Sequence, residues 1–99
     1  MTDIDLSVLQ PVNNAEEHRF EIKLGDDIAL IDYMLNGRNI TMTHTEVPPA
    51  FEGKGIAGKL AKFALDWAAA EGYKVNPLCP YVKNYINKHP EYQANAWGY

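Results

Sequence analysis

Three successive stretches in the first half of the chain alternate apolar and polar residues. Residues 18–24, HRFEIKL, carry an apolar side chain at every second position, which is typical of a half-buried strand. Residues 28–35, IALIDYML, are richer in apolar and aromatic residues and predict a more buried strand. Residues 39–47, NITMTHTEV, alternate again and stop at a Pro-Pro pair. The short turns GDD and NGR join the stretches, so the pattern predicts an antiparallel meander of three strands.

The period of the pattern then changes from two residues to that of a helix. It predicts a helix over residues 56–71, which Gly72 ends. The apolar face of this helix comprises Ile56, Leu60, Phe63, Ala64, Trp67 and Ala68. Residues 73–79 predict a short strand, parallel to its neighbour because a helical crossover reaches it. A second helix begins at Pro80 and stops at Pro90, which gives an α+β (α/β) fold with the order β-β-β-α-β-α.

Composition limits the classes of protein that fit this pattern. A chain of 99 residues with 46% apolar content supports one core, so residues 1–99 are expected to form a single domain. The net charge of -4 argues against nucleic-acid binding. One cysteine excludes an internal disulfide and a cysteine-rich metal cluster. The N-terminal MTDIDLSVLQ does not have the pattern of a signal peptide, and Asp66 interrupts the most apolar helix, so we expect a cytoplasmic protein without a membrane partner.

The stretch EGKGIAGKL, residues 52–60, matches two nucleotide-binding loops by spacing alone. Gly53, Gly55 and Gly58 fit the G-x-G-x-x-G of dinucleotide-binding folds, and part of the stretch fits the NTPase loop G-x-x-x-x-G-K. The dinucleotide loop must directly follow the first strand of a βαβ unit, whereas here the Pro-Pro pair intervenes. The NTPase loop requires a hydroxyl residue where Leu60 stands. The context therefore argues against both classes.

The physical properties of this loop still favour an anion. Its three glycines let backbone N–H groups approach a ligand, and the helix that begins at Ile56 directs its positive dipole end to the same place. Lys54, Lys59 and Lys62 surround that helix start and would suit a pyrophosphate. The alternative is that the glycines only form a tight turn and the lysines only a solvated face.

Two segments of the chain resemble the GNAT superfamily of N-acetyltransferases. The loop pattern of that superfamily is Q/R-x-x-G-x-G/A, and residues 52–57 match it everywhere except at Glu52. The segment NPLCPYVKNYINKHPEYQ is similar to a minimal branch of about one hundred residues with a PLCP stretch and a HPEY ending. The similarity covers about residues 18–93 and implies a compact GNAT-like fold.

The resemblance implies an acetyl-CoA site between two parallel strands. The backbone from Thr45 to Val47 would bond the pantetheine arm and the acetyl carbonyl, and the strand Val75–Leu78 would splay away to leave a notch for the thioester. A tyrosine of the last helix would protonate the departing thiolate, with Tyr85 as the first candidate and Tyr81 as the second. The implied cofactor-binding residues are Thr45, Val47, Gly53, Lys54, Gly55, Ile56, Ala57, Gly58 and Lys59.

Three further residues are candidates for catalysis. Cys79 precedes Pro80 at a helix start, where a thiolate is favoured, and it could form an acetyl-cysteine or line the thioester pocket. Its alternative is a small buried hydrophobe. His44 and Glu46 share one face of their strand, so either could remove a proton from an ammonium acceptor, or both could be ordinary solvent-facing groups.

The short turns also bear on the acceptor. Longer GNAT domains are covered by helices where this chain has only turns, so the resemblance implies an open acceptor cleft. An open cleft on an acidic protein suits a protein lysine or a polyamine. We therefore expect an acetyl-CoA-dependent N-acetyltransferase that is a monomer or weak dimer and holds no metal. The alternative is a CoA-binding or protein-interaction module without efficient catalysis.

Overall fold

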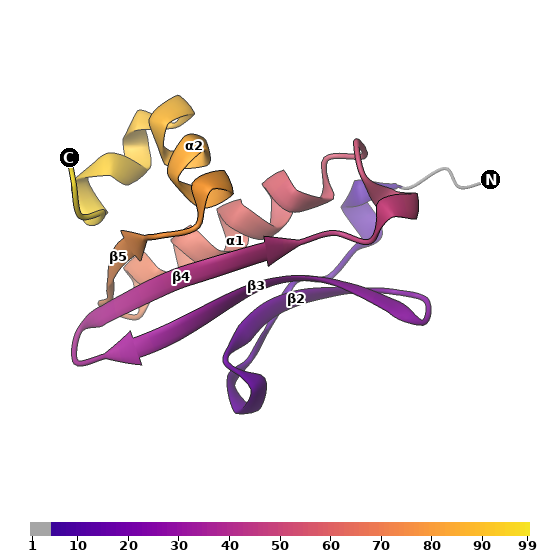
Figure 1. Cartoon of the computed structure of the whole chain (residues 1–99), viewed down its shortest axis with the longest axis horizontal. Coiled ribbons are helices and arrows are strands. Elements are labelled where there is room, and N and C mark those ends of the chain that lie inside the picture. The colour runs from indigo at the N-terminus through magenta and orange to yellow at the C-terminus, as the bar shows by residue number, and fades with distance from the viewer. Residues whose placement is uncertain (1–4) are drawn as a thin grey trace.

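The computed structural model describes residues 5–99, which form one five-stranded sheet with two α-helices (Figure 1). Residues 1–4, part of the stretch expected not to be a signal peptide, lie outside the described residues. The strands are β1 (Val12–Asn14), β2 (Arg19–Leu24), β3 (Asp27–Asn36), β4 (Asn39–Glu46) and β5 (Lys74–Pro77). The α-helices are α1 (Ile56–Ala70) and α2 (Pro80–Lys88). Short 3-10 helices are η1 (Leu6–Val8), η2 (Ala15–Glu17), η3 (Pro49–Phe51) and η4 (Pro90–Asn95).

The strands follow one another in space in the order β1-β2-β3-β4-β5, and their directions agree with the predicted topology. Strands β1 to β4 pair antiparallel, and β5 pairs parallel to β4 after the α1 crossover. The predicted three-strand meander is incomplete, because β1 adds a fourth antiparallel strand at the edge. The sequence VNN is too short and too polar to show a strand pattern. Its position depends on tertiary contacts, including a 2.7 Å hydrogen bond from Tyr33 Oη to Asn13 Oδ1.

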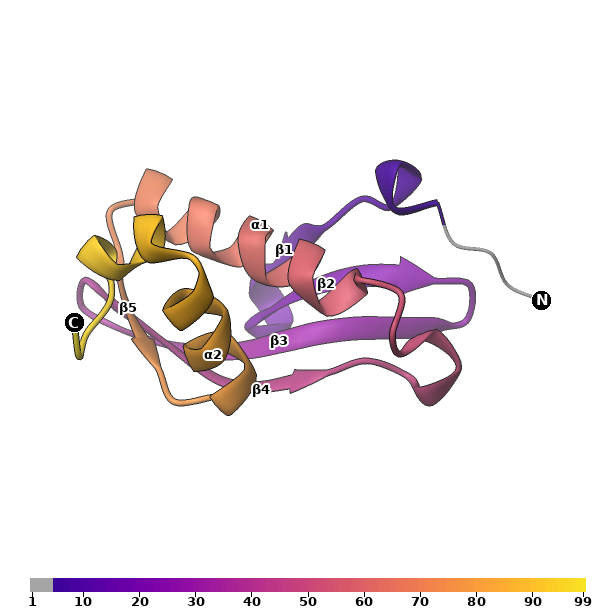
Figure 2. The same cartoon turned by 90° about the horizontal axis from the view of Figure 1, so that it is seen from above.

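Both α-helices lie on the same side of the sheet, as the two views in Figures 1 and 2 show. The side chains of Phe20, Ile31 and Ile40 point to this side and are fully buried. Each such side chain contributes about 1.5–3 kcal/mol through burial. Trp67, predicted as a core residue, is half-buried and packs edge-on against Phe20 with ring centroids 5.4 Å apart. The helix-covered side therefore contains the core.

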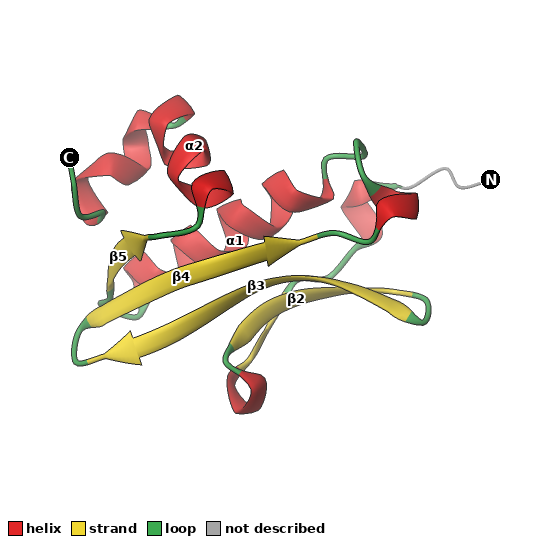
Figure 3. Cartoon of the chain, viewed as in Figure 1, coloured by secondary structure: helices red, strands yellow, loops and turns green. Residues whose placement is uncertain are grey.

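The opposite side of the sheet has no α-helix over it within residues 5–99 (Figure 3). Two-residue turns with positive φ at Gly25 and Gly37 connect β2 to β3 and β3 to β4, as the predicted short turns require. Because side chains alternate along strands, the residues between the buried ones, such as Leu30 and Asp32, point to this side. We call this side the open face. In the same part of the chain no helix has the length and apolar character needed to span a membrane.

A one-residue bulge interrupts the alternation of β4. Tyr33 pairs with Met42 and Asp32 pairs with His44, so Thr43 has no direct partner on β3. Ile40 and Met42 point into the core before the bulge, whereas His44 and Glu46 point to the open face after it. Without the bulge, regular alternation would direct His44 and Glu46 into the core, on the same side as Ile40 and Met42. With the bulge, both polar side chains point to the open face.

Candidate active site

A notch opens at the edge of the sheet where β5 ends and β4 continues. The parallel pairing ends at Met42 and Pro77, and the final link is a 2.9 Å hydrogen bond from the Cys79 N–H to the Met42 carbonyl. From Thr43 onward, no described strand pairs with β4 on the β5 side. The opening therefore arises because β5 ends at Pro77 and the chain turns into α2, whereas the predicted splaying of the strand is not seen, since all four residues of β5 pair with β4.

The backbone of Thr45 faces this notch. Tyr33 donates its N–H to the His18 carbonyl on the β2 side, so the backbone groups of its neighbour Asp32 point toward β4. There Asp32 pairs with His44, and Leu30 pairs in the same way with Glu46. Thr45, between these two pairs, must direct its own N–H and C=O to the free edge of β4. A ligand in the notch can bond to them.

The glycine loop forms the second wall of the notch. Gly53 and Gly55 have φ values of 77° and 83°, and Gly55 is the N-cap of α1, which begins at Ile56 as predicted. The loop and the end of β4 enclose a cavity of about 230 Å³. It is lined by Thr45, Val47, Phe51, Glu52, Gly53, Ile56, Ala57 and Tyr81. The structure thus brings together five of the predicted cofactor-binding residues, Thr45, Val47, Gly53, Ile56 and Ala57, from two separate segments.

The lysines near the start of α1 differ in availability. The Lys59 ammonium donates to the Leu6 carbonyl of the N-terminal segment. Lys62 pairs with Asp66 at 2.9 Å, one turn further along α1. Only Lys54 of the three has no ion pair or side-chain hydrogen bond within residues 5–99, and it is exposed. Of the three lysines predicted to surround the helix start, Lys59 and Lys62 are therefore engaged by other groups of the chain.

Tyr81 and Tyr85 both reach from α2 toward Gly58 in the first turn of α1, but of the two only Tyr81 lines the cavity. A Cβ added at Gly58 would lie 3.6 Å from Tyr81 Oη, so the phenol reaches from α2 to the first turn of α1. Burial first, and then Tyr85, raise the pKa of Tyr81 above its ordinary value. The Tyr85 ring stacks on His89 with centroids 3.9 Å apart, and the cavity lining does not include it. The geometry favours the second sequence candidate over the first.

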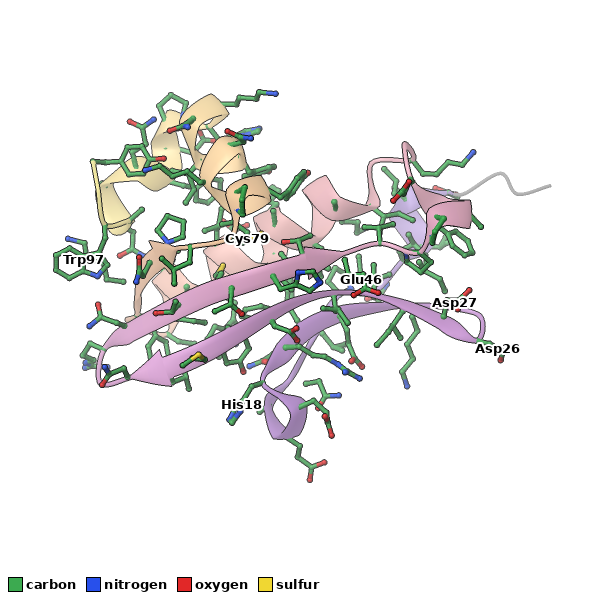
Figure 4. All side chains as sticks on the ribbon, viewed as in Figure 1. His18, Asp26, Asp27, Glu46, Cys79 and Trp97 are labelled. Atoms are coloured by element: carbon green, nitrogen blue, oxygen red, sulfur yellow. The ribbon has the colours of Figure 1, made fainter. Side chains whose placement is uncertain are left out.

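Cys79 lies behind the cavity wall. Its side chain is 4% exposed, and Sγ lies 3.1 Å from Thr45 Oγ1. It occupies the N-cap position of α2 between the sheet and the helices (Figure 4). Thr45 therefore separates the sulfur from the cavity, and Cys79 supports a residue of the notch from behind.

His44 and Glu46 form a pair on the open face, in agreement with their predicted common face. His44 Nε2 lies 3.2 Å from Glu46 Oε1, and both side chains are more than half exposed. Figure 4 shows Glu46 at the end of β4 on the side away from the helices. The notch lies between this pair and Tyr81, so an amine could arrive from one side while the thiolate is protonated from the other.

Two cavity residues were missing from the predicted set. Phe51 belongs to η3, a single turn that the Pro-Pro pair only suggests. Glu52 lines the cavity with an exposed carboxylate, exactly the position at which the loop departs from the superfamily pattern in charge. That departure was the one signal in the sequence that set Glu52 apart from the rest of the loop.

Known proteins resemble this chain across almost its whole length. Residues 19–95 match the family described as GCN5-related N-acetyl-transferase. Protein NATD1 of Gallus gallus is 35% identical over 85 residues, which cover 83% of this chain and 77% of that protein. Protein NATD1 of Danio rerio is 33% identical over 95 residues, covering 90% and 86%.

The fold is also shared with a solved structure. The NMR structure of a GCN5-like protein from Staphylococcus aureus superposes with a TM-score of 0.73 at 26% identity, and the match covers 94% of this chain and 92% of that one. The GNAT-like fold predicted from the two sequence segments is thereby confirmed. The chain belongs to the family of GCN5-related N-acetyltransferases, whose members transfer acetyl groups.

Proposed function

We propose that the protein transfers an acetyl group from acetyl-CoA to an amine, and that the amine is a protein lysine or a polyamine. One observation carries this proposal: a cavity lies between the glycine loop at the start of α1 and the edge of β4 that has no described strand beside it after Met42. A CoA ester needs both features, the first for its pyrophosphate and the second for its pantetheine arm.

The loop suits a pyrophosphate on physical grounds. Gly53 has no other atom within 4 Å of the position that a Cβ would take, so its backbone is open to a ligand. The first amides of α1 have no partners within the helix, and an anion there gains about 0.3–1 kcal/mol from the helix dipole. Exposed Lys54 adds a charge nearby. These groups would hold the nucleotide end of the co-substrate.

Groups on the two sides of the notch perform different steps of the transfer, removal of a proton from the acceptor on one side and protonation of the thiolate on the other. His44 or Glu46 accepts the proton that an ammonium acceptor must lose before attack. The amine nitrogen forms a bond to the acetyl carbon, the bond from that carbon to sulfur breaks, and the nitrogen gives up its second proton, which restores the phenol of Tyr81 after that group has protonated the thiolate. The Tyr81 phenol, kept protonated by its raised pKa, donates its proton to the thiolate. The acetyl group passes directly to the amine in this scheme.

Acetylation of a panel of acceptors tests the proposal. Basic peptides, a polyamine and a small neutral amine are incubated with acetyl-CoA and the protein, and products are identified by mass. We expect acetylated peptides or polyamine, because the notch is open on the face that carries His44 and Glu46. Efficient turnover of the neutral amine with no acetylation of the basic acceptors would contradict the proposed acceptor class.

Glu52 should weaken the binding of CoA. Its carboxylate lines the cavity next to the loop that would hold the pyrophosphate, and like charges repel. Glu52→Gln is expected to tighten CoA binding about fivefold, equivalent to about 1 kcal/mol, with a smaller gain at high salt. Calorimetric titration at two salt concentrations measures this. Glu71→Gln, at the exposed far end of α1, removes the same charge and should leave the affinity unchanged. An equal change in CoA affinity in Glu52→Gln and Glu71→Gln would contradict the placement of the Glu52 carboxylate beside the CoA site.

Cys79 should not carry the acetyl group. The sulfur is buried behind Thr45, so Cys79→Ala is expected to cost about 1 kcal/mol of stability while the transfer rate stays within about threefold. Intact mass after incubation with acetyl-CoA alone should show no adduct. Cys79→Ser, which retains a polar contact to Thr45, is the matched control. An adduct on the wild-type cysteine together with an inactive Cys79→Ala protein would establish a covalent role instead.

A further inference from the structure

A second cavity lies on the open face at the β1 edge of the sheet, outside the notch. Its volume is about 480 Å³, which lies in the range of ligand sites. The N-terminal segment and strand β1 supply apolar walls, and strand β2 supplies two charged groups. The residues that matter for the argument are Val8, Leu9, Val12, Asn14, Glu21 and Lys23. The proposed acetyl transfer uses none of them.

Glu21 gives this cavity a defined chemistry. The residue is only 5% exposed, and its Oε1 accepts hydrogen bonds from Arg19 Nε at 2.8 Å and Asn14 Nδ2 at 3.2 Å. The hydrogen bond from Arg19 is the main factor that holds the pKa of this carboxyl below its ordinary value, so Glu21 is ionised at neutral pH. Within residues 5–99 its Oε2 has no hydrogen-bond partner, and no polar side-chain atom there is both fully buried and unpaired, so Oε2 keeps some exposure, and Glu21 is a residue that lines the cavity. Arg19 pairs with the carboxylate at Oε1, and Oε2, beside the apolar walls, suits a second cation on an aliphatic stem.

A cross-strand row connects this cavity to the notch. Val12 pairs with Glu21, Glu21 with Leu30, and Leu30 with Glu46. Directly paired residues point to the same side of a sheet, so all four share the open face. Two strand spacings separate Glu21 from Glu46, and the notch lies one spacing further, on the β5 side of β4, so Glu21 and the notch are about 14 Å apart. An extended polypeptide covers about 13 Å in four residues, and its side chains at positions i and i+4 point the same way.

We propose that the acceptor is a polypeptide segment with two basic residues four positions apart, one presented to the notch and the other bound in the β1 cavity by Glu21. The methylene stem of the second residue packs on Val8, Leu9 and Val12, and its cationic head reaches Oε2 of Glu21. A polyamine fits less well, because an internal ammonium would lie over Leu30. The placement of one basic residue in the notch rests on the proposed acetyl transfer, whereas the binding of the other in the β1 cavity does not.

Two substitutions in the β1 cavity should change the affinity for the dibasic segment in opposite directions. Lys23 lies two residues from Glu21 on the same face, and its ammonium opposes a second cation in the cavity. Lys23→Gln should therefore strengthen binding of the dibasic segment. Val12 is 44% exposed and stands directly opposite Glu21, so Val12→Lys should occupy Oε2 and weaken the binding without disturbing the core.

Fluorescence anisotropy with labelled peptides, in the absence of acetyl-CoA, is the decisive experiment. One peptide carries lysines at i and i+4, and its control has glutamine at i+4. The dibasic peptide should bind the wild-type protein about tenfold more tightly, as expected for one hydrogen bond to a charged group. Val12→Lys should abolish that advantage and Lys23→Gln should enlarge it. Equal affinities of the two peptides, or variants that change neither, would overturn the proposal.

A parallel acetylation assay separates this inference from the proposed function. If the dibasic peptide binds as expected but is never acetylated, the β1 cavity stands as a peptide site and the transfer proposal fails. If both peptides are acetylated with the same kcat/KM and bind equally, acetyl transfer stands and the second binding site is refuted.

Discussion

Tyr81→Phe should lower kcat for acetyl transfer about 100-fold while the KM for acetyl-CoA changes little. The phenol lines the notch, and the ring of phenylalanine would keep the packing but could not protonate the thiolate. General acid catalysis is commonly worth about 100-fold or more, equivalent to about 2.7 kcal/mol of barrier. Initial rates over a range of acetyl-CoA concentrations measure both constants.

The pH dependence adds a second readout for this residue. Burial raises the pKa of Tyr81, and the required form is the neutral phenol, so activity that depends on it is retained at neutral pH and lost only as the pH rises through a pKa above about 10. This alkaline decline should disappear in Tyr81→Phe. Tyr85→Phe is the matched control and should retain most of the activity, because Tyr85 stacks on His89. A larger loss in Tyr85→Phe than in Tyr81→Phe would contradict the assignment.

Gly55→Ala should reduce both the stability of the protein and its affinity for CoA. Gly55 has a φ of 83°, which costs an L-residue about 1–2 kcal/mol, and a Cβ there would lie 3.0 Å from Leu6 Cδ1. For a domain of this size each kcal/mol lowers the Tm by about 4–8 °C. Because the loop would rotate the first amides of α1 away from the anion, we expect about tenfold weaker CoA binding. Thermal unfolding and calorimetric titration measure the two effects.

Gly58→Ala is the control within the same helix start. Gly58 has ordinary helical geometry, and its new Cβ would meet Tyr81 Oη at a normal contact distance of 3.6 Å. This substitution should stabilise the protein by about 0.5–1 kcal/mol and leave CoA binding unchanged. A stable Gly55→Ala protein with unchanged CoA affinity would show that the positive φ at the N-cap is not needed for the anion site.

The sequence predicted the repetitive elements well, because burial enforces their periodicity. The three strands from residue 18, the helix from Ile56 and the helix from Pro80 are present within a few residues of the predicted bounds. Strand β1 could not be predicted, since its three residues acquire strand geometry only by pairing with β2. The hydrogen bond from Lys59 to the Leu6 carbonyl was equally hidden, because it joins segments more than fifty residues apart.

The position of the glycine loop in the candidate site could be predicted from the sequence, whereas the positions of the candidate catalytic side chains could be predicted only in part. Gly53, Gly55 and the start of α1 follow from local glycine chemistry, and in the structure Gly53, Ile56 and Ala57 line the cavity while Gly55 is the N-cap of α1. The bulge at Thr43 could not be predicted, because residues 43–46 of the sequence are all polar, although it decides which face His44 and Glu46 occupy. Helical phase alone did not show that Tyr81 reaches the cavity and Tyr85 does not, because that choice depends on how α2 packs against α1.

Release of free CoA from acetyl-CoA, followed with and without a mixed pool of lysine peptides and polyamines, tests the account most directly. A protein that joins an anion site, a free β4 edge and a protonated tyrosine at one notch should release CoA at a rate that depends on the amine. Binding of CoA, seen as a rise in Tm, should accompany it. A rise in Tm with no amine-dependent release would contradict catalysis and identify a CoA-binding module, and no rise at all would contradict the site itself.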